Sequence, residues 1–313
     1  MSDRKKVTIV GAGMTGGAMA QRLAEKGYCD VVLQDEPSIV ETMHHGKALD
    51  LAQSAAWARF DSQVIPTDTW DATAGSEVIV LTAGAPRKPG MSREELLNNN
   101  AGIVRDKVQN AVKHSPNAVL IVFANPMDAM CHVALTASKF PRERVIGQGG
   151  MLDSARYRTF VSRELGVSIK DVAGYVFGGH TDTTMVPIVS LTMAGGLPLT
   201  SLLPKDKIDA LVERTMKGGA EVLGLLKTGS AYQAPAAATI EMVEAILLDQ
   251  HRLLPCSILM QGEYGIKDVV CGTIVKLGTG GVQHVYEAPV SPEELAKIKA
   301  AADATKELVG LLT

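Results

Sequence analysis

Aromatic residues, clustered cysteines and long apolar runs are all scarce in this chain. Only 4% of its 313 residues are aromatic, so a platform that stacks nucleic acid bases is not expected. The net charge of −3 gives no electrostatic reason to expect nucleic acid or an anionic membrane as a partner. Charges, glycines or prolines interrupt every apolar run before it reaches the length of a membrane span. What remains is the composition of an ordinary globular protein, 46% hydrophobic and 21% charged.

The cysteines also exclude several classes of protein. Cys29, Cys131, Cys256 and Cys271 lie far apart, with neither a Cys-x-x-Cys pair nor zinc-finger spacing, so we expect no metal site. The first residues lead into an expected strand without the apolar region of a signal peptide. We therefore expect reduced thiols in a cytoplasmic protein. Most histidines, His44 and His45 among them, lie in polar helical or turn-like stretches and are expected to be solvated.

A glycine-rich turn is the first positive signal. An apolar run at 7–10 ends at Gly11-Ala-Gly-Met-Thr-Gly16, and a helical pattern follows at 18–26. In such a strand–turn–helix unit the first glycine permits the turn, the second admits a pyrophosphate and the third lets helix and strand pack. A second expected strand, 30–35, ends in Asp35, where a ribose-binding acid belongs. Asp35 would repel a 2′-phosphate, which favours NAD over NADP; the alternative is a surface acid at a strand end.

The pattern after this unit remains an alternation of strands and helices. Strands are expected at 63–66, 77–81, 118–123 and 144–147, with helices at 46–56, 92–114 and from about 126 to 139. Ser92 and Glu95 form a capping-box pattern at the start of the second helix. This alternation predicts an α/β fold, a Rossmann doubly wound parallel sheet, with the ligand across the carboxyl ends of its strands.

The second half of the chain has a mixed pattern. Helices are expected at 151–165, 205–226, 234–249 and from 292, and strands at 172–177, 184–191, 257–261 and 269–277. We predict an NAD-binding domain at 1–150 and a mixed α+β, substrate-binding domain at 151–313. No linker separates the two, so they are expected to pack closely.

A few polar residues stand where chemistry is possible. The segment 82–93 carries two arginines between an expected strand and a helix, so it is either a lid or a basic surface loop. Asp153 and Arg156 share a helix face, a spacing that most often means a surface salt bridge. His180 is flanked by glycines at a strand end, and Asn125 closes an apolar strand before a proline. Spacing alone does not decide among these alternatives.

Taken in order, these motifs resemble one family. The motifs are Gly11-x-Gly-x-x-Gly16, Asp35, Ala-Pro-Arg-Lys-Pro-Gly-Met-Ser-Arg at 85–93, Asn100-Ala-Gly, Asn125-Pro, Leu-Asp153-x-x-Arg156 and Gly-Gly-His180. Together they resemble the malate/lactate dehydrogenase superfamily. They are most similar to its lactate-dehydrogenase-like type of NAD-dependent malate dehydrogenase. The resemblance extends from Val7 to the C-terminal helix.

The resemblance implies a role for each site residue. His180 is the general acid and base, and Asp153 holds its tautomer. Arg156 binds the C1 carboxylate of malate or oxaloacetate, and Asn125 hydrogen-bonds the substrate. The Asn125–Pro126 peptide is expected to be cis. The residues implied to bind NAD are Gly11, Ala12, Gly13, Met14, Thr15, Gly16, Asp35, Asn100, Phe123, Ala124 and Asn125.

The two arginines of the segment 82–93 receive different roles by the same resemblance. Arg93 polarises the carbonyl group when the lid closes. Arg87 stands where lactate enzymes of the family have a neutral residue, and it would pair with the second carboxylate of oxaloacetate. Pyruvate would leave this guanidinium unpaired in a dry site, which disfavours lactate as the substrate.

Three departures from the family pattern and three alternatives remain. Thr181 replaces a glycine in a longer loop after His180, the segment after Asp35 is long, and Gln233 stands where relatives tend to have an aromatic residue. The alternatives are a lactate or other 2-hydroxyacid dehydrogenase, a metal-dependent family 4 glycosidase and a non-catalytic NAD sensor. A homodimer or homotetramer is expected from the family and from base rates.

Overall fold

Six parallel strands form the first part of the main sheet. The computed structural model describes residues 4–36, 42–85 and 92–312. The strands are β1 (Lys5–Val10), β2 (Cys29–Gln34), β3 (Val64–Thr67), β4 (Val78–Leu81), β5 (Val119–Val122) and β6 (Val145–Gly147). They pair in parallel in the order β3-β2-β1-β4-β5-β6. Because the chain order reverses between β1 and β4, their carboxyl ends form the crevice where such folds bind dinucleotides.

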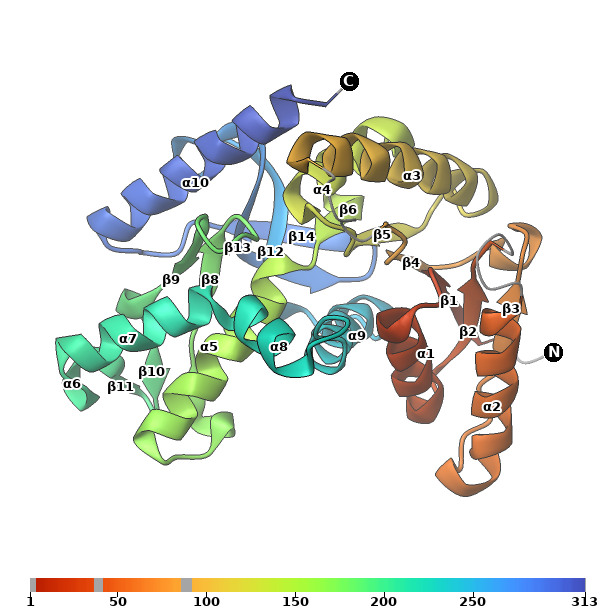
Figure 1. The fold of residues 1–313 in the computed structure, drawn as a ribbon, viewed down its shortest axis with the longest axis horizontal. Helices are drawn as coiled ribbons and strands as arrows, with labels where there is room; N and C mark the ends of the chain where they lie inside the picture. Colours follow the sequence, from red (N-terminus) through yellow and green to blue (C-terminus); the bar gives the residue numbers. More distant parts are fainter. Residues whose placement is uncertain (1–3, 37–41, 86–91, 313) are drawn as a thin grey trace.

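Helices cover both faces of these strands. They are α1 (Met14–Lys26), α2 (Met43–Ala58), α3 (Arg93–His114) and α4 (Met127–Ser138), with the short turns η1 (Asp71–Thr73) and η2 (Arg142–Arg144). Neighbouring residues of β1 point to opposite faces. Ile9 packs in one core with Met19 of α1, whereas Val10 packs in another with Leu97 of α3. Figure 1 shows α1 below the strands and α3 and α4 above them. The prediction of a doubly wound sheet is confirmed.

One antiparallel contact extends this sheet into the second half of the chain. Ser257 of β12 (Arg252–Gln261) pairs with Gly147 at the end of β6. A Cβ at Gly147 would lie 2.9 Å from Ser257 Cβ, so glycine permits this approach. The order continues β12-β13-β8-β9, and β14 pairs with β13. The added strands are β8 (Val176–Gly178), β9 (Met185–Pro187), β13 (Lys267–Gly278) and β14 (Gly281–Tyr286).

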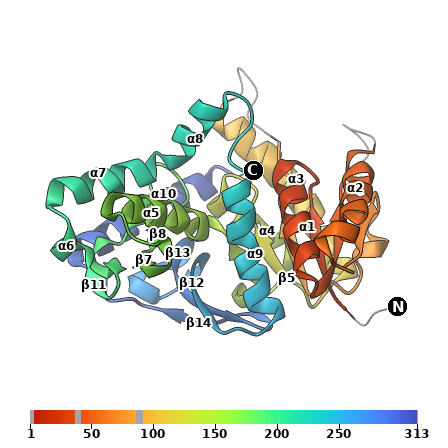
Figure 2. The same ribbon diagram turned by 90° about the horizontal axis from the view of Figure 1, so that it is seen from below.

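Helices and a small sheet complete the second half. The small sheet joins β7 (Val172–Ala173), β10 (Met193–Ala194) and β11 (Leu197–Pro198). The helices and turns are α5 (Gly149–Leu165), η3 (Ile169–Asp171), η4 (Val189–Leu191), α6 (Leu199–Leu202), α7 (Lys205–Met216), α8 (Gly218–Leu226), α9 (Gln233–Leu247), η5 (Glu263–Gly265) and α10 (Pro292–Gly310). Figure 2 shows α9 between α1 and α5, and it packs against both. The two halves therefore share a sheet and a helix, which agrees with the predicted close packing.

The structure corrects three expected elements. The strand expected at 172–177 is two strands in different sheets, and between them a Cβ at Gly174 would lie 3.2 Å from the ring of Tyr157. The helix expected at 205–226 is divided at Lys217 into α7 and α8, because Gly218 and Gly219 favour helix poorly. The strand expected at 184–191 ends at Pro187. Strand β14 was not predicted. The division of the chain at residue 150 stays a prediction.

The capping box predicted at Ser92 and Glu95 is confirmed, and a second one, Ser291 with Glu294, begins α10. Among the described residues, we find no helix whose length and apolar character would let it cross a membrane.

Candidate active site

The turn after β1 depends on its glycines. Gly11 has a φ of +104°, and its N–H donates to the carbonyl oxygen of Gln34 at 2.8 Å. A Cβ at Gly16 would lie 1.9 Å from the carbonyl oxygen of Gly11, so only glycine lets α1 begin this close to β1. A Cβ at Gly13 would meet nothing within 4 Å. The first amides of α1, beginning at the exposed Met14, are thus available to a pyrophosphate, and the turn fits a dinucleotide.

Asp35 follows β2 and contacts the same turn. Its Oδ2 accepts a hydrogen bond from the N–H of Ala12 at 2.7 Å, and its Oδ1 accepts one from the N–H of Glu36 at 2.8 Å. An ionised carboxylate offers about four acceptor positions, so two hydroxyl groups of a ribose can share it. The position fits the expected ribose contact.

Lys47 of α2 also reaches the turn, a contact that the sequence did not indicate. Its Nζ donates to the carbonyl oxygens of Ala12 and Gly13 at 2.5 and 2.9 Å. Burial lowers the pKa of Lys47, while the charge of Asp35 opposes this. The sequence carried no signal for this role, because a lysine in an amphipathic helix is usually solvated.

Asn100 joins two loops at the carboxyl edge of the sheet. Its Nδ2 donates to the carbonyl oxygen of Asn125 at 2.7 Å, and its Oδ1 accepts from the N–H of Ala85 at 2.9 Å. Asn100 is buried. Its side chain therefore holds the segments after β4 and β5 together, which fits a positioning role better than direct contact with a ligand.

The chain turns out of the sheet immediately after β5. The N–H groups of Phe123 and Ala124 both donate to the carbonyl oxygen of Leu81, at 3.0 and 3.1 Å. The Asn125–Pro126 peptide is cis, as predicted. α4 begins directly after this proline, so its first turn lies at the carboxyl edge of the sheet.

His180, Asp153 and Arg156 form one hydrogen-bonded cluster. Asp153 Oδ2 is 2.7 Å from His180 Nδ1, and Asp153 Oδ1 accepts from Arg156 Nη1 at 3.1 Å. The side chain of Asp153 is 1% exposed, and those of Arg156 and His180 are about 14% and 15% exposed. The alternative of a surface salt bridge between Asp153 and Arg156 is therefore wrong. Because Nδ1 of His180 is hydrogen-bonded to Asp153, Nε2 is the ring nitrogen of His180 that can exchange a proton with a ligand.

The charges around His180 determine the direction of its pKa. Burial lowers this pKa, but the carboxylate of Asp153 raises it by its charge and its hydrogen bond, and Asp128 adds to the rise. Arg156 opposes them. The pKa of His180 is raised overall, so the imidazolium persists to higher pH than in a free histidine.

Asp128, in the first turn of α4, is a site residue that our sequence reasoning missed. Its Oδ2 accepts a hydrogen bond from the backbone N–H of His180 at 2.7 Å. This contact brings His180 of the second half against the first turn of α4, directly after the loop that follows β5. The available signal was a single carboxylate in the otherwise apolar start of α4.

Two glycines make room for the cluster. A Cβ at Gly149, the first residue of α5, would lie 2.9 Å from His180 Cβ. A Cβ at Gly218 would lie 3.0 Å from Arg156 Cδ. The break between α7 and α8 therefore coincides with the place where α8 begins against this arginine.

The longer loop after His180 is closed by threonine hydroxyl groups. Thr181 Oγ1 and Thr184 Oγ1 are 2.6 Å apart, and the N–H of Gly179 donates to the carbonyl oxygen of Thr184 at 3.1 Å. Thr181 is not among the described residues with positive φ, so this backbone does not require the family's glycine. At the third departure, Gln233 accepts a hydrogen bond from Arg22 at 3.1 Å, between α9 and α1.

The two lid arginines cannot be placed in this cluster. Arg87 lies outside the described residues, as does part of the long segment after Asp35. Arg93 begins α3, and its side chain is likewise outside what the structure describes.

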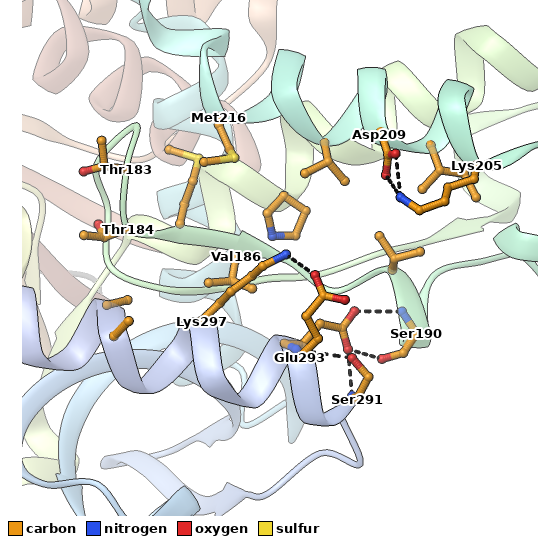
Figure 3. A pocket seen from close by; sticks show the side chains of 18 of the residues that line it. Thr183, Thr184, Val186, Ser190, Lys205, Asp209, Met216, Ser291, Glu293 and Lys297 are labelled. Atoms are coloured by element: carbon orange, nitrogen blue, oxygen red, sulfur yellow. Dashed lines mark hydrogen bonds and ion pairs between the residues drawn. The ribbon is translucent and has the colours of Figure 1, made fainter.

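A separate cavity of about 940 Å³ lies among α7, α10 and β9. Figure 3 shows that charged side chains in it are already paired, Lys205 with Asp209 and Lys297 with Glu293. Much of the remaining lining is apolar, including Val186 and Met216. Thr183 and Thr184 at one end connect it to the loop after His180, but it contributes no group to the cluster.

Both halves of the chain match models of the same protein family. Residues 5–147 match the NAD binding domain of lactate/malate dehydrogenase, and residues 150–309 match its alpha/beta C-terminal domain. The chain belongs to the lactate/malate dehydrogenase family. The resemblance stated from the motifs is confirmed, and so is the Rossmann fold with its C-terminal α/β part.

Individual members of this family are similar over nearly the full length. The malate dehydrogenase of Thermomicrobium roseum is 51% identical over 306 residues, which cover 98% of this chain and 97% of that protein. The structure of malate dehydrogenase from Salinibacter ruber has a TM-score of 0.92 at 41% identity, covering 98% and 97% of the two chains. A Cryptosporidium parvum lactate dehydrogenase, complexed with lactic acid and nicotinamide adenine dinucleotide, has a TM-score of 0.94 at 36% identity, covering 99% and 98%. The fold therefore does not separate malate enzymes from lactate enzymes.

Proposed function

We propose that this chain is an NAD-dependent malate dehydrogenase that interconverts (S)-malate and oxaloacetate. The observation that carries the proposal is the buried cluster of His180, Asp153 and Arg156, which Asp128 connects to the carboxyl edge of the NAD-binding sheet. The names of similar proteins support it, since the relative from Thermomicrobium roseum is a malate dehydrogenase.

Proton transfer is assigned to Nε2 of His180. In malate oxidation the neutral imidazole takes the hydroxyl proton while a hydride leaves C2. When bound, the nicotinamide supplies the hydride acceptor. In the reverse direction the imidazolium donates its proton to the carbonyl oxygen of oxaloacetate. Asp153 keeps the remaining proton on Nδ1 and stabilises the imidazolium, because its carboxylate lies 2.7 Å away.

Arg156 is assigned to the C1 carboxylate of the substrate. Asp153 fixes the guanidinium through one nitrogen, Nη1, and Gly218 leaves space beside its Cδ. A planar guanidinium held in this way can present a two-pronged donor pair to a carboxylate. The side chains of Arg156 and Asp153 are largely buried, so a substrate carboxylate would pair with Arg156 in a site where water screens the charges little.

The cofactor is assigned to the turn after β1. Gly11, Gly13 and Gly16 shape the turn, and the amides of residues 13–16 would receive the pyrophosphate, since the N–H of Ala12 is already bonded to Asp35. Asp35 would bind the ribose hydroxyl groups and repel the extra phosphate of NADP. Asn125 with the backbone at 123–125 is assigned to the nicotinamide end, and Asn125 also to the substrate, whereas Asn100 positions this loop through its hydrogen bond to the carbonyl oxygen of Asn125.

Substrate choice is assigned to Arg87 and carbonyl polarisation to Arg93, both on the strength of the sequence. The second carboxylate of oxaloacetate would neutralise Arg87, and pyruvate would not. An unpaired charge in a closed site costs several kcal/mol, so we expect kcat/KM for oxaloacetate to exceed that for pyruvate by about 10³-fold or more.

The test is the rate of NADH oxidation with oxaloacetate and with pyruvate, each with and without a chelator. A preference for pyruvate would make the protein a lactate dehydrogenase. Activity that required an added divalent ion would contradict the assigned chemistry.

A variant isolates the substrate assignment. Arg87→Gln is expected to lose most oxaloacetate activity and to gain pyruvate activity relative to it. Lys88→Gln is the matched control, because it removes a neighbouring positive charge from the same segment. If Arg87→Gln leaves the ratio of the two substrates unchanged, the role of Arg87 is wrong.

We also propose a homodimer or homotetramer and a cytoplasmic location. Leu49 and Trp57 of α2 are 62% and 90% exposed, an apolar surface that a second copy would cover. The four cysteines are free and buried, which suits a reducing compartment. Sedimentation equilibrium tests the first point: a mass of two or four chains of 33.1 kDa is expected, and a single-chain mass would contradict it.

A further inference from the structure

Two adjacent histidines converge on one carboxylate at the start of α2. His44 Nε2 and His45 Nε2 lie 2.6 and 2.9 Å from the same oxygen, Oδ1 of Asp68. The side chain of His44 is only 2% exposed, whereas those of His45 and Asp68 are both 44% exposed. The expectation that both histidines are solvated is therefore wrong for His44.

The fold explains how these distant residues meet. α2 packs beside β3 (Figure 1), and Asp68 directly follows the last residue of that strand. His44 and His45 lie in the first turn of α2, which is the end of the helix that contacts Asp68. The two rings are 4.4 Å apart and tilted by 53°, so both can direct Nε2 at Asp68.

The three donor atoms have the chemistry of a metal site. All ligand atoms lie within 4.8 Å of one another. In a tetrahedral zinc site with bonds of about 2.0–2.1 Å, neighbouring ligands are roughly 3.3 Å apart. The distances from His44 and His45 to Asp68 would therefore need to lengthen by about 0.7 and 0.4 Å. We propose that His44, His45 and Asp68 bind one divalent transition-metal ion such as Zn²⁺.

The donor set selects among ions. Imidazole nitrogen suits Zn²⁺, Cu²⁺ and Ni²⁺, whereas Mg²⁺ and Ca²⁺ prefer oxygen ligands. The exposed side formed by His45 and Asp68 would leave the remaining coordination positions to water.

The proposed site lies on α2 and at the end of β3, and neither element contributes a residue to the His180 cluster. Thr67, which precedes Asp68, accepts a hydrogen bond from the N–H of Asp35 at 3.3 Å. The ion would thus fasten α2 to the end of β3 beside the expected ribose contact. Our cysteine-based expectation of no metal site missed this arrangement, because Asp68 is 24 residues from His44 in the sequence.

The test is metal binding by the full chain without a histidine tag, after treatment with a chelator. Zn²⁺ is measured by equilibrium dialysis, and Co²⁺ by its visible absorption as a substitute for zinc. The variants are His45→Ala and Asp68→Asn, whose side chains are partly exposed and which should fold. His251→Ala is the matched control, since His251 forms a similar exposed pair with Asp249 at 3.3 Å but lacks a second histidine.

The wild type and the His251→Ala variant are expected to bind one ion per chain. His45→Ala and Asp68→Asn are expected to bind it about a hundredfold more weakly or not at all. The proposal is overturned if the wild type shows no saturable binding, or if both site variants bind as tightly as the control.

A second inference concerns Asp128 and rests on the proposed function. This carboxylate is 5% exposed, and its Oδ1 has no hydrogen-bond partner among the described residues. Its Oδ2 accepts from the backbone N–H of His180. Burial raises the pKa of Asp128 to about 6, so it is ionised at neutral pH. We infer that Asp128 is a positioning residue that holds the backbone of His180 and favours its imidazolium by charge.

The other charged and titratable groups around Asp128 do not replace it. Asp153 and Arg156 on α5 pair with each other; Asp153 also contacts His180, and the charge of Arg156 opposes the imidazolium. Cys131 on α4 and Cys271 on β13 face Asp128, and burial raises the pKa of both thiols, so they stay neutral. A variant of Asp128 therefore isolates its charge.

Asp128→Asn keeps an oxygen that can accept the His180 N–H and removes the charge. We expect kcat/KM for oxaloacetate to fall about threefold to tenfold at about pH 8 and less at about pH 6, with KM for NADH unchanged. Asp303→Asn, an exposed substitution on α10, is the control. An unchanged pH profile in an active Asp128→Asn protein overturns this inference alone, whereas a wild type without oxaloacetate activity overturns the proposed function.

Discussion

Replacing Asp153 by asparagine is the sharpest test of the His180 cluster, because one carboxylate serves two partners. Oδ2 faces His180 Nδ1 at 2.7 Å, and Oδ1 accepts from Arg156 Nη1 at 3.1 Å. An asparagine has one oxygen and one NH₂ group, so it can serve only one partner. If the oxygen of the asparagine accepts from His180 Nδ1, its NH₂ group faces the N–H donors of Arg156. If the asparagine is turned the other way, its NH₂ group donates to Nδ1 and the ring proton moves to Nε2.

The size of the effect follows from the same geometry. Two unit charges 2.7 Å apart attract by about 6 kcal/mol at an effective dielectric constant of about 20. Burial of both groups offsets much of this, and hydrogen bonds to charged groups retain about 1.5–3 kcal/mol net. Because 1.36 kcal/mol is tenfold in rate, kcat/KM for oxaloacetate should fall by about 10- to 150-fold in Asp153→Asn.

The assay is the pH dependence of kcat/KM in both directions. The folded pKa of His180 is raised, so oxaloacetate reduction, which needs the imidazolium, persists above the ordinary pKa and falls as pH rises through the raised one. Malate oxidation rises over the same range. In Asp153→Asn this transition should move to lower pH, with KM for NADH unchanged. A variant with the pH profile of the wild type would refute the role of the carboxylate.

Three further substitutions test other parts of the structure. Asp35→Asn should lower the preference for NADH over NADPH at least about tenfold, measured as the ratio of kcat/KM values, because the charge that repels the extra phosphate is removed. Gly16→Ala should raise the dissociation constant of NADH more than about tenfold in a fluorescence titration, since its Cβ would lie 1.9 Å from the oxygen of Gly11. Ser291→Ala should lower the free energy of unfolding by about 1 kcal/mol in urea, because Ser291 caps α10 in a box with Glu294. Unchanged values in these three measurements would contradict, respectively, the ribose contact, the need for glycine and the contribution of the cap.

Patterns with a strict local cause were predictable. The turn at Gly11–Gly16 requires glycine on steric grounds, and apolar runs such as 118–123 indicate strands buried on both faces. Breaks inside a pattern were not predictable. The helix expected at 205–226 divides at Lys217, where Gly218 and Gly219 favour helix poorly, but the close approach of Gly218 to Arg156 is invisible in the local sequence.

The candidate site shows the same division. His180, Asp153 and Arg156 were predicted from the resemblance, and the structure brings them together. Asp128 and Lys47 were missed, because one is a carboxylate in an apolar helix and the other a lysine in an ordinary amphipathic stretch. Their partners are backbone groups, the N–H of His180 and the carbonyl oxygens of Ala12 and Gly13. Because these backbone groups do not depend on the type of side chain, the sequence does not show which of them a side chain will contact.

By itself, the sequence determined the class of fold, the glycine-rich cofactor turn and the residue types available for hydride-transfer chemistry. Each of these depends on local sterics, on periodicity or on a motif in chain order. Tertiary structure alone decided which polar groups share a partner. It placed two carboxylates against His180, and it brought His44 and His45 to Asp68 across the end of β3. Hydrogen bonds and ion pairs depend on distances of about 3 Å between residues far apart in the chain, and only the packed sheet and helices set those distances.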